Sequence, residues 1–109
     1  MIFKFQKFDI LYYILYHINM RFEWDDNKNI LNKQKHGISF ETAALVFNDA
    51  NRIEFYDNIH STEIEERYIT IGRAGNVLFV VFTERKDKKR IISARMADKN
   101  ERRLYYGNS

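Results

Sequence analysis

The 109-residue chain contains no cysteine and no proline, and it has only four glycines. The lack of cysteine excludes disulfides, thiolate nucleophiles and cysteine-based metal sites, and it fits a reducing compartment such as the cytoplasm. The three histidines, at positions 17, 36 and 60, do not have the spacing of a metal site. We therefore expect a cytoplasmic protein that uses neither a metal nor another cofactor.

Long hydrophobic runs are also absent. The most apolar stretch, residues 8–18, has eleven residues, whereas a membrane-spanning helix needs about 20. This stretch also lacks the small-residue cleavage site of a signal peptide, and regular patterning begins only at Arg21. We interpret residues 1–19 as an N-terminal extension, such as a misassigned start codon upstream of Met20 would produce, and residues 20–109 as one domain with no membrane contact.

Charge is unevenly distributed along the chain. The formal net charge is only +3, but residues 84–109 contain nine basic and four acidic side chains, whereas residues 20–83 contain seven basic and ten acidic ones. A basic region of this kind is what a nucleic-acid partner requires, although a solvated hairpin and helix would have the same composition. The charge pattern therefore permits RNA binding without requiring it.

Local signals predict a short strand and then a helix at the start of the domain. Residues 21–24 alternate between polar and apolar side chains, as in an edge strand. Asp25 is placed to cap the following helix, and Gly37 suits the left-handed position at its end. Ile30 and Leu31 are expected to supply the apolar contact of this helix.

The rest of the domain predicts a second helix, a sheet and a final helix. Ser39 is placed to cap a helix whose apolar residues recur every three or four positions. From residue 52 the period changes to two, and the continuous apolar run 77–83 is expected to be a central strand buried on both faces. A capping-box pattern from Asp98 to Glu101 begins the last helix. The order predicts an α+β fold, in which an antiparallel sheet of about four to five strands packs against two N-terminal helices and one C-terminal helix.

Six short motifs follow one another along the domain. They are Phe22-Glu23-Trp24-Asp25, Lys35-His36-Gly37-Ile38-Ser39-Phe40, Glu65-Glu66-Arg67, Ile71-Gly72, Arg90-Ile91-Ile92-Ser93-Ala94-Arg95 and Glu101-Arg102-Arg103. Each motif alone is weak, but their order resembles that of the BrnT toxin family, the ribonuclease half of a bacterial type II toxin–antitoxin pair. The resemblance covers about residues 20 to 106. It implies a RelE-like fold, cleavage of mRNA that inhibits translation and growth, and neutralisation by a BrnA-like antitoxin, with operator DNA bound only through the antitoxin.

Metal-independent RNA cleavage uses the 2′-hydroxyl of the substrate as nucleophile, so the protein must move protons and stabilise charge on the phosphorane. His36 is the candidate acid or base because imidazole titrates near neutrality, and Lys35 beside it favours the uncharged ring. Alone, His36 would more often be a structural residue at a helix end. Arg67 and Arg95 are candidate phosphate clamps. Glu65 is a second candidate base, because on a strand it shares a face with Arg67, and a structural ion pair between Glu65 and an arginine of a neighbouring strand is the equal alternative.

Further residues are expected to contact RNA. Arg90 and Arg95 are five positions apart on one strand, so their side chains are expected to face opposite ways. Tyr105 is a candidate for stacking on a base, although helix packing is its more usual role, and Trp24 is expected in the core. The alternative is a non-catalytic module that binds nucleic acid or the antitoxin with the same groups. The residues assigned to RNA binding are Lys33, Lys88, Lys89, Arg90, Arg102, Arg103 and Tyr105, and with Lys86 the C-terminal cations are expected to form one basic surface for RNA and for an acidic antitoxin segment.

Overall fold

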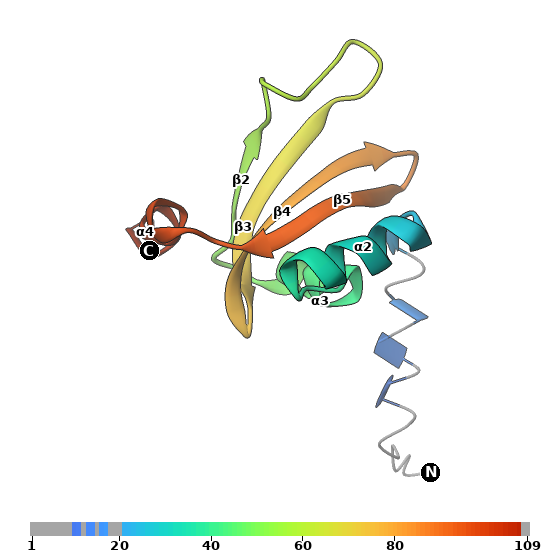
Figure 1. Ribbon diagram of the computed structural model, residues 1–109, viewed down its shortest axis with the longest axis horizontal. Helices are drawn as coiled ribbons and strands as arrows, with labels where there is room; N and C mark the ends of the chain where they lie inside the picture. The colour runs from blue at the N-terminus through green and yellow to red at the C-terminus, as the bar shows by residue number, and fades with distance from the viewer. Residues whose placement is uncertain (1–9, 12, 15, 18–20, 108–109) are drawn as a thin grey trace.

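The computed structural model describes residues 21–107 together with positions 10, 11, 13, 14, 16 and 17. The proposed extension, residues 1–19, lies largely outside the described residues, and its role stays a prediction. The elements are β1 (Phe22–Glu23), α2 (Asp26–His36), α3 (Phe40–Leu45), the 3-10 helix η1 (Val46–Asn48), β2 (Ile53–Tyr56), β3 (Arg67–Ala74), β4 (Asn76–Arg85), β5 (Lys88–Met96) and α4 (Lys99–Gly107). Figure 1 shows the helices packed around one curved sheet, and the predicted α+β class is confirmed.

The sheet has the strand order β1-β5-β4-β3-β2. Strands β2 to β5 form an antiparallel meander, whereas β1 pairs with β5 in parallel. The sheet is therefore mixed and not purely antiparallel as predicted. The reason is that β1 lies beside the last strand of the meander and runs in the same direction, an arrangement that local sequence patterns do not reveal.

Capping side chains set the limits of the helices. The Asp25 carboxylate accepts a backbone N–H from the first turn of α2, and Gly37 ends that helix with a φ of 72°. Ser39 caps α3 in the same way. Asp98 and Glu101 exchange two hydrogen bonds at the start of α4 and form the predicted capping box. Of the helices in the described residues, none is long and apolar enough to cross a membrane.

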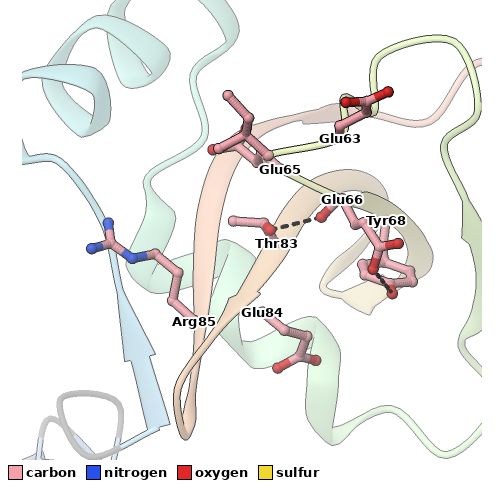
Figure 2. Close-up of a pocket in the computed structure, with 8 residues that line it drawn as sticks. Glu63, Glu65, Glu66, Tyr68, Thr83, Glu84 and Arg85 are labelled. Atoms are coloured by element: carbon pink, nitrogen blue, oxygen red, sulfur yellow. Dashed lines mark hydrogen bonds between the residues drawn. The ribbon is translucent and has the colours of Figure 1, made fainter.

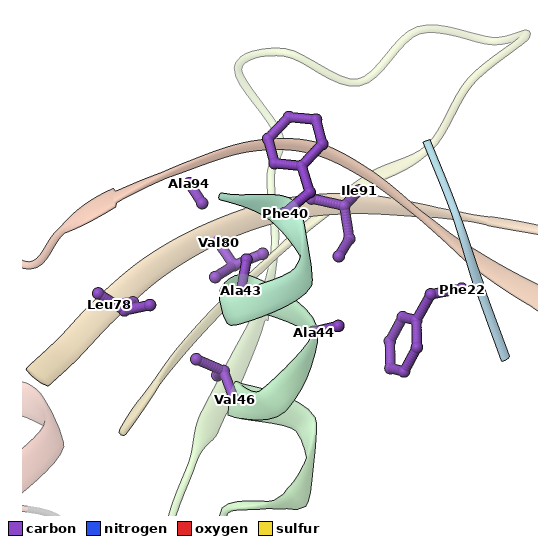
Figure 3. Packing of buried hydrophobic residues seen from close by; sticks show 9 residues of the cluster. All are labelled: Phe22, Phe40, Ala43, Ala44, Val46, Leu78, Val80, Ile91 and Ala94. Atoms are coloured by element: carbon purple, nitrogen blue, oxygen red, sulfur yellow. The ribbon is translucent and has the colours of Figure 1, made fainter. Parts of the chain in front are cut away.

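One face of the sheet packs against α3 and η1, and we call it the helix face (Figure 3). Phe40 is fully buried there, and such burial of a large apolar side chain stabilises the fold by about 2–3 kcal/mol. The cluster consists of Phe22, Phe40, Ala43, Ala44, Val46, Leu78, Val80, Ile91 and Ala94. Trp24 packs against this cluster, with its ring 6.1 Å from that of Phe40, as the sequence predicted.

The opposite face of the sheet, which we call the open face, is packed only at one end. Tyr105 of α4 forms a second cluster there with Ile71, Val77 and Ala97. Elsewhere on this face, Phe79 and Val81 are only half-buried. The expectation that residues 77–83 are buried on both faces therefore holds for the helix face and for Val77 and Thr83 of the open face, but not for Phe79 and Val81.

Tyr105 fixes α4 to the rest of the fold. Its hydroxyl donates a hydrogen bond to Asp49 Oδ2 at 2.6 Å, which raises the pKa of Tyr105 to about 12. Burial acts to raise the pKa of Asp49, but hydrogen bonds from Tyr105 and from the backbone N–H groups of Arg73 and Asn51 together lower it. Since Tyr105 is buried, the structure favours helix packing, the more usual role named for it, and its contact with RNA stays a prediction.

Helix α2 contacts the sheet through asparagine and not through its apolar side chains. Ile30 and Leu31 are 57% and 61% exposed, so the contact predicted for them is wrong. Asn32 is buried instead. Its Nδ2 donates hydrogen bonds to the carbonyls of Ile38 and Ala94, and its Oδ1 accepts one from the Ala94 N–H. Asn32 therefore forms hydrogen bonds with the backbone of β5 beyond the end of β1, where a longer neighbouring strand would otherwise pair.

Candidate active site

A bulge in β5 decides which of its side chains share a face. Arg95 pairs with Phe79 of β4, and Arg90 pairs with Thr83, with one additional β5 residue between these pairs. Phe79 and Thr83 are four positions apart on β4, so they lie on the same face. Arg90 and Arg95 therefore both project from the open face. The predicted opposite orientation is wrong, because counting by twos fails across a bulge.

Three side chains cross the open face in a row, which we call the arginine row. Thr83 of β4 pairs with Arg67 of β3 on one side and with Arg90 of β5 on the other. Because adjacent strands lie about 4.8 Å apart, the Cα atoms of the two arginines are roughly 10 Å apart. Their side chains are 32% and 28% exposed. Two guanidinium groups at this spacing can hold one phosphate from both sides.

Each end of the arginine row carries a carboxylate. Glu65 Oε1 accepts a hydrogen bond of 2.8 Å from Arg67 Nε, so the two residues are neighbours as predicted, although Glu65 precedes β3 and is not on a strand. At the other end, Glu23 Oε2 lies 3.7 Å from Arg90 Nη1, beyond hydrogen-bond distance. The terminal nitrogens of Arg67 make no hydrogen bond with a described residue. Those of Arg90 come no closer to a described carboxylate than this 3.7 Å contact with Glu23. Both arginines therefore retain donors for a phosphate.

Glu23, like Thr83, belongs to this group although sequence reasoning did not single it out. It pairs with Arg90 across the parallel β1–β5 contact, and its Oε1 lies 3.9 Å from Arg85 Nε. A signal was present in the alternation of residues 22–24. Phe22 and Trp24 pack into the core, so Glu23 must face the other way.

Beside the arginine row is a hollow of about 440 Å³ (Figure 2). Thr83 Oγ1 donates a hydrogen bond of 2.7 Å to the Glu66 carbonyl at its wall. The charge of the Glu66 carboxylate raises the pKa of Tyr68 nearby. A phosphate is not expected in this hollow because four of its lining side chains are acidic and only one is basic: Glu63, Glu65, Glu66, Glu84 and Arg85.

Arg95 lies on the open face but is already engaged. Its two terminal nitrogens donate to both Glu101 oxygens, at 2.7 and 2.9 Å, and its guanidinium lies 3.9 Å from the centre of the Phe79 ring. The hydrogen bonds with Glu101 raise the pKa of Arg95 above its ordinary value. To hold a phosphate, Arg95 would have to give up this bidentate pair, which joins β5 to α4.

Lys35 and His36 lie away from the arginine row. Asn32 holds α2 along the outer edge of β5 beside Ala94, and α2 then continues toward the end of β5 where Arg95 lies (Figure 1). From strand spacing and helix rise, His36 is roughly 20 Å from Arg67. The structure thus places the predicted residues in two groups: Glu65 and Arg67 in one, Lys33, Lys35, His36 and Arg95 at the other end of β5.

The predicted single basic surface is divided in the structure. Lys88 begins β5, whereas Arg102 and Arg103 follow its end, and the nine residues of this strand span roughly 25–30 Å. Lys89 lies over the rings of Phe47 and Phe82 on the helix face and is paired with Glu84. Arg102 donates to the Ala97 carbonyl. The C-terminal cations therefore do not form one patch, because a complete strand separates them.

The sequence model of a family described as "Ribonuclease toxin, BrnT, of type II toxin-antitoxin system" matches residues 24–101. The chain belongs to the BrnT toxin family. This confirms the resemblance carried by the six motifs. The match includes the arginine row, Glu65, His36 and Arg95, and it ends before Arg102 and Arg103.

A solved structure supports the fold of this BrnT toxin. The crystal structure of the ribonuclease toxin BrnT from Brucella abortus aligns with a TM-score of 0.57 and 21% sequence identity. The alignment covers 72% of this chain and 97% of that chain. At this identity the likeness shows the fold and does not assign residues. A comparison with curated proteins finds no match.

Proposed function

We propose that this BrnT toxin cleaves RNA on its open face, with the scissile phosphate held between Arg67 and Arg90. The observation that supports this site is the arginine row itself. It combines two half-buried guanidinium groups, of which only the Arg67 Nε donates a hydrogen bond to a described residue, with a carboxylate at each end. Binding of a phosphodiester needs the guanidinium groups, and its cleavage needs the guanidinium groups and a carboxylate.

The proposed chemistry divides between the arginines and Glu65. Glu65 binds Arg67 through Oε1 only, so its second oxygen can accept the proton of the RNA 2′-hydroxyl as this group attacks phosphorus. The P–O5′ bond then breaks to leave a 2′,3′-cyclic phosphate, and the departing 5′-oxygen takes a proton from Glu65 or from water. Arg67 and Arg90 donate hydrogen bonds to the non-bridging oxygens, where negative charge increases in the pentavalent state. The reaction needs no nucleophile from the protein, which fits a chain without cysteine.

In the cell, we infer that cleavage of mRNA inhibits translation and growth, and that a BrnA-like antitoxin neutralises the toxin. An acidic antitoxin segment would compete with RNA for Arg67 and Arg90, because carboxylates and phosphates use the same guanidinium donors. Operator DNA would be bound through the antitoxin. The arginine row supports this competition, since it places Arg67 and Arg90 on one face on either side of Thr83.

Cleavage of a labelled RNA by the purified protein in EDTA tests the proposal. A single 2′-deoxynucleotide at the cleavage position should block cleavage there, because the nucleophile is missing. Arg90→Ala should reduce the rate by roughly 10- to 100-fold, since hydrogen bonds to charged groups contribute about 1.5–3 kcal/mol. Lys99→Ala, which removes one exposed charge from α4, is the control and should keep the rate. RNA binding without cleavage would instead identify a non-catalytic binding module.

A further inference from the structure

Strand β2 is an open edge of the sheet. It is the last strand in the order β1-β5-β4-β3-β2, and none of the described residues pairs with its outer side (Figure 1). Phe55 and Tyr56 are exposed. An exposed edge with large apolar side chains is a template for an additional strand, and natural proteins usually cover or shorten such edges.

The direction of the β2 backbone groups follows from two hydrogen bonds. The Asp57 N–H donates to the Arg67 carbonyl of β3, and the Ile53 carbonyl accepts from the Thr70 hydroxyl of the same strand. Because inward and outward groups alternate along an antiparallel strand, the N–H and C=O groups of Glu54 and Tyr56 point outward. These four groups are placed to pair with an incoming chain.

The two sides of this edge differ in chemistry. On the open face, a hollow of about 420 Å³ lies between β2 and α4, and its lining consists of the ion-paired Arg52 and Glu54 and of three apolar side chains: Ile53, Phe55 and Leu104. On the helix face, Glu54 is exposed and accepts a hydrogen bond of 2.8 Å from Arg52, and Glu66 is exposed with its carboxylate beside Tyr68. An added strand would place alternate side chains against the apolar part of the hollow and against carboxylates.

Charge selects a polypeptide over a nucleic acid as the occupant. Residues 52–64, which exclude the arginine row and Glu65, contain three carboxylates and one arginine, whereas the whole chain has a net charge of +3. This negative region disfavours phosphates and favours lysine or arginine. We propose that β2 is a docking edge for an extended segment of a partner protein, in which apolar side chains alternate with basic ones. The inference does not depend on RNA cleavage, because this edge is separate from the arginine row.

The test uses synthetic octapeptides and fluorescence anisotropy. An alternating lysine–valine peptide should bind the full-length protein, whereas an alternating glutamate–valine peptide should not. The Glu54→Pro variant should bind the first peptide at least roughly tenfold more weakly than Glu54→Ala, since both lose the carboxylate but only proline loses the outward N–H. Thermal unfolding should show that both variants remain folded, and both should cleave RNA at the wild-type rate if the proposed function holds.

Two further peptides make the result decisive even if Glu54→Pro does not fold. A lysine–valine peptide with N-methylated backbone donors should lose binding, and so should a peptide with four lysines followed by four valines. If the N-methylated peptide, or the peptide with four lysines followed by four valines, bound as tightly as the alternating lysine–valine peptide, strand addition would be overturned. If a short RNA with the same number of charges displaced the lysine–valine peptide, the choice of a polypeptide partner would be overturned.

Discussion

Replacing Glu65 by glutamine should lower the rate of RNA cleavage by roughly 10²- to 10⁴-fold, the range of general acid–base catalysis. Glutamine has the same size as glutamate and can still accept the hydrogen bond that Arg67 Nε donates. The arginine row should therefore keep its geometry, while the group that takes the 2′-hydroxyl proton is lost. Single-turnover cleavage at saturating enzyme separates this effect from a change in RNA affinity.

The matched variant is His36→Gln. The sequence favoured His36 for proton transfer, but strand spacing and helix rise put it roughly 20 Å from Arg67, too far for both side chains to act on one phosphate. The rate of His36→Gln should therefore stay within a few-fold of the wild type. The reverse result, a slow His36→Gln and an unaffected Glu65→Gln, would move the chemistry to the end of α2 and would contradict the arginine row as the site of cleavage.

Asn32→Ala should reduce the free energy of unfolding by about 3 kcal/mol. The substitution removes three hydrogen bonds and leaves the N–H and C=O of Ala94 and the C=O of Ile38 without these partners. A typical hydrogen bond contributes about 1 kcal/mol, and a buried group left without a partner costs about 1–3 kcal/mol. Denaturation in urea, followed by tryptophan fluorescence of Trp24, measures the change.

The control for this variant is Asn27→Ala on the same helix. Asn27 is exposed, so its replacement should change stability by no more than about 0.5 kcal/mol. An Asn32→Ala protein as stable as Asn27→Ala would show that α2 is held by something other than its asparagine. Leu31→Ala is then the informative variant, because the sequence assigned the contact to this exposed side chain.

Local interactions were predictable from the sequence, and these set most of the fold. Asp25, Ser39 and the Asp98–Glu101 pair cap their helices as expected, because a cap depends on side chains within three or four residues. Glu65 also lies beside Arg67 as expected, although it precedes β3 and is not part of the strand. Each of these predictions needed only a short stretch of chain.

Predictions that depended on distant residues were less successful. The bulge near Ile91 reversed the expected orientation of Arg90 relative to Arg95. The strand contains no glycine or proline that would have indicated a bulge. Asn32 is buried because the edge of β5 needs a partner, and the sequence of α2 does not contain that information. Arg95 is paired with Glu101 because α4 folds back toward the open face. In all three cases the deciding interaction comes from another part of the sheet.

An NMR titration tests most directly whether the arginine row binds the scissile phosphate. The arginine Nε–H signals of the full-length protein are followed while a short RNA with 2′-O-methyl groups is added, so that binding occurs without cleavage. The signals of Arg67 and Arg90 should shift together and saturate, while those of Arg73 and Arg103 should not move. Shifts confined to Arg95 and Arg103, with Arg67 and Arg90 unchanged, would place the RNA elsewhere and contradict the proposed site.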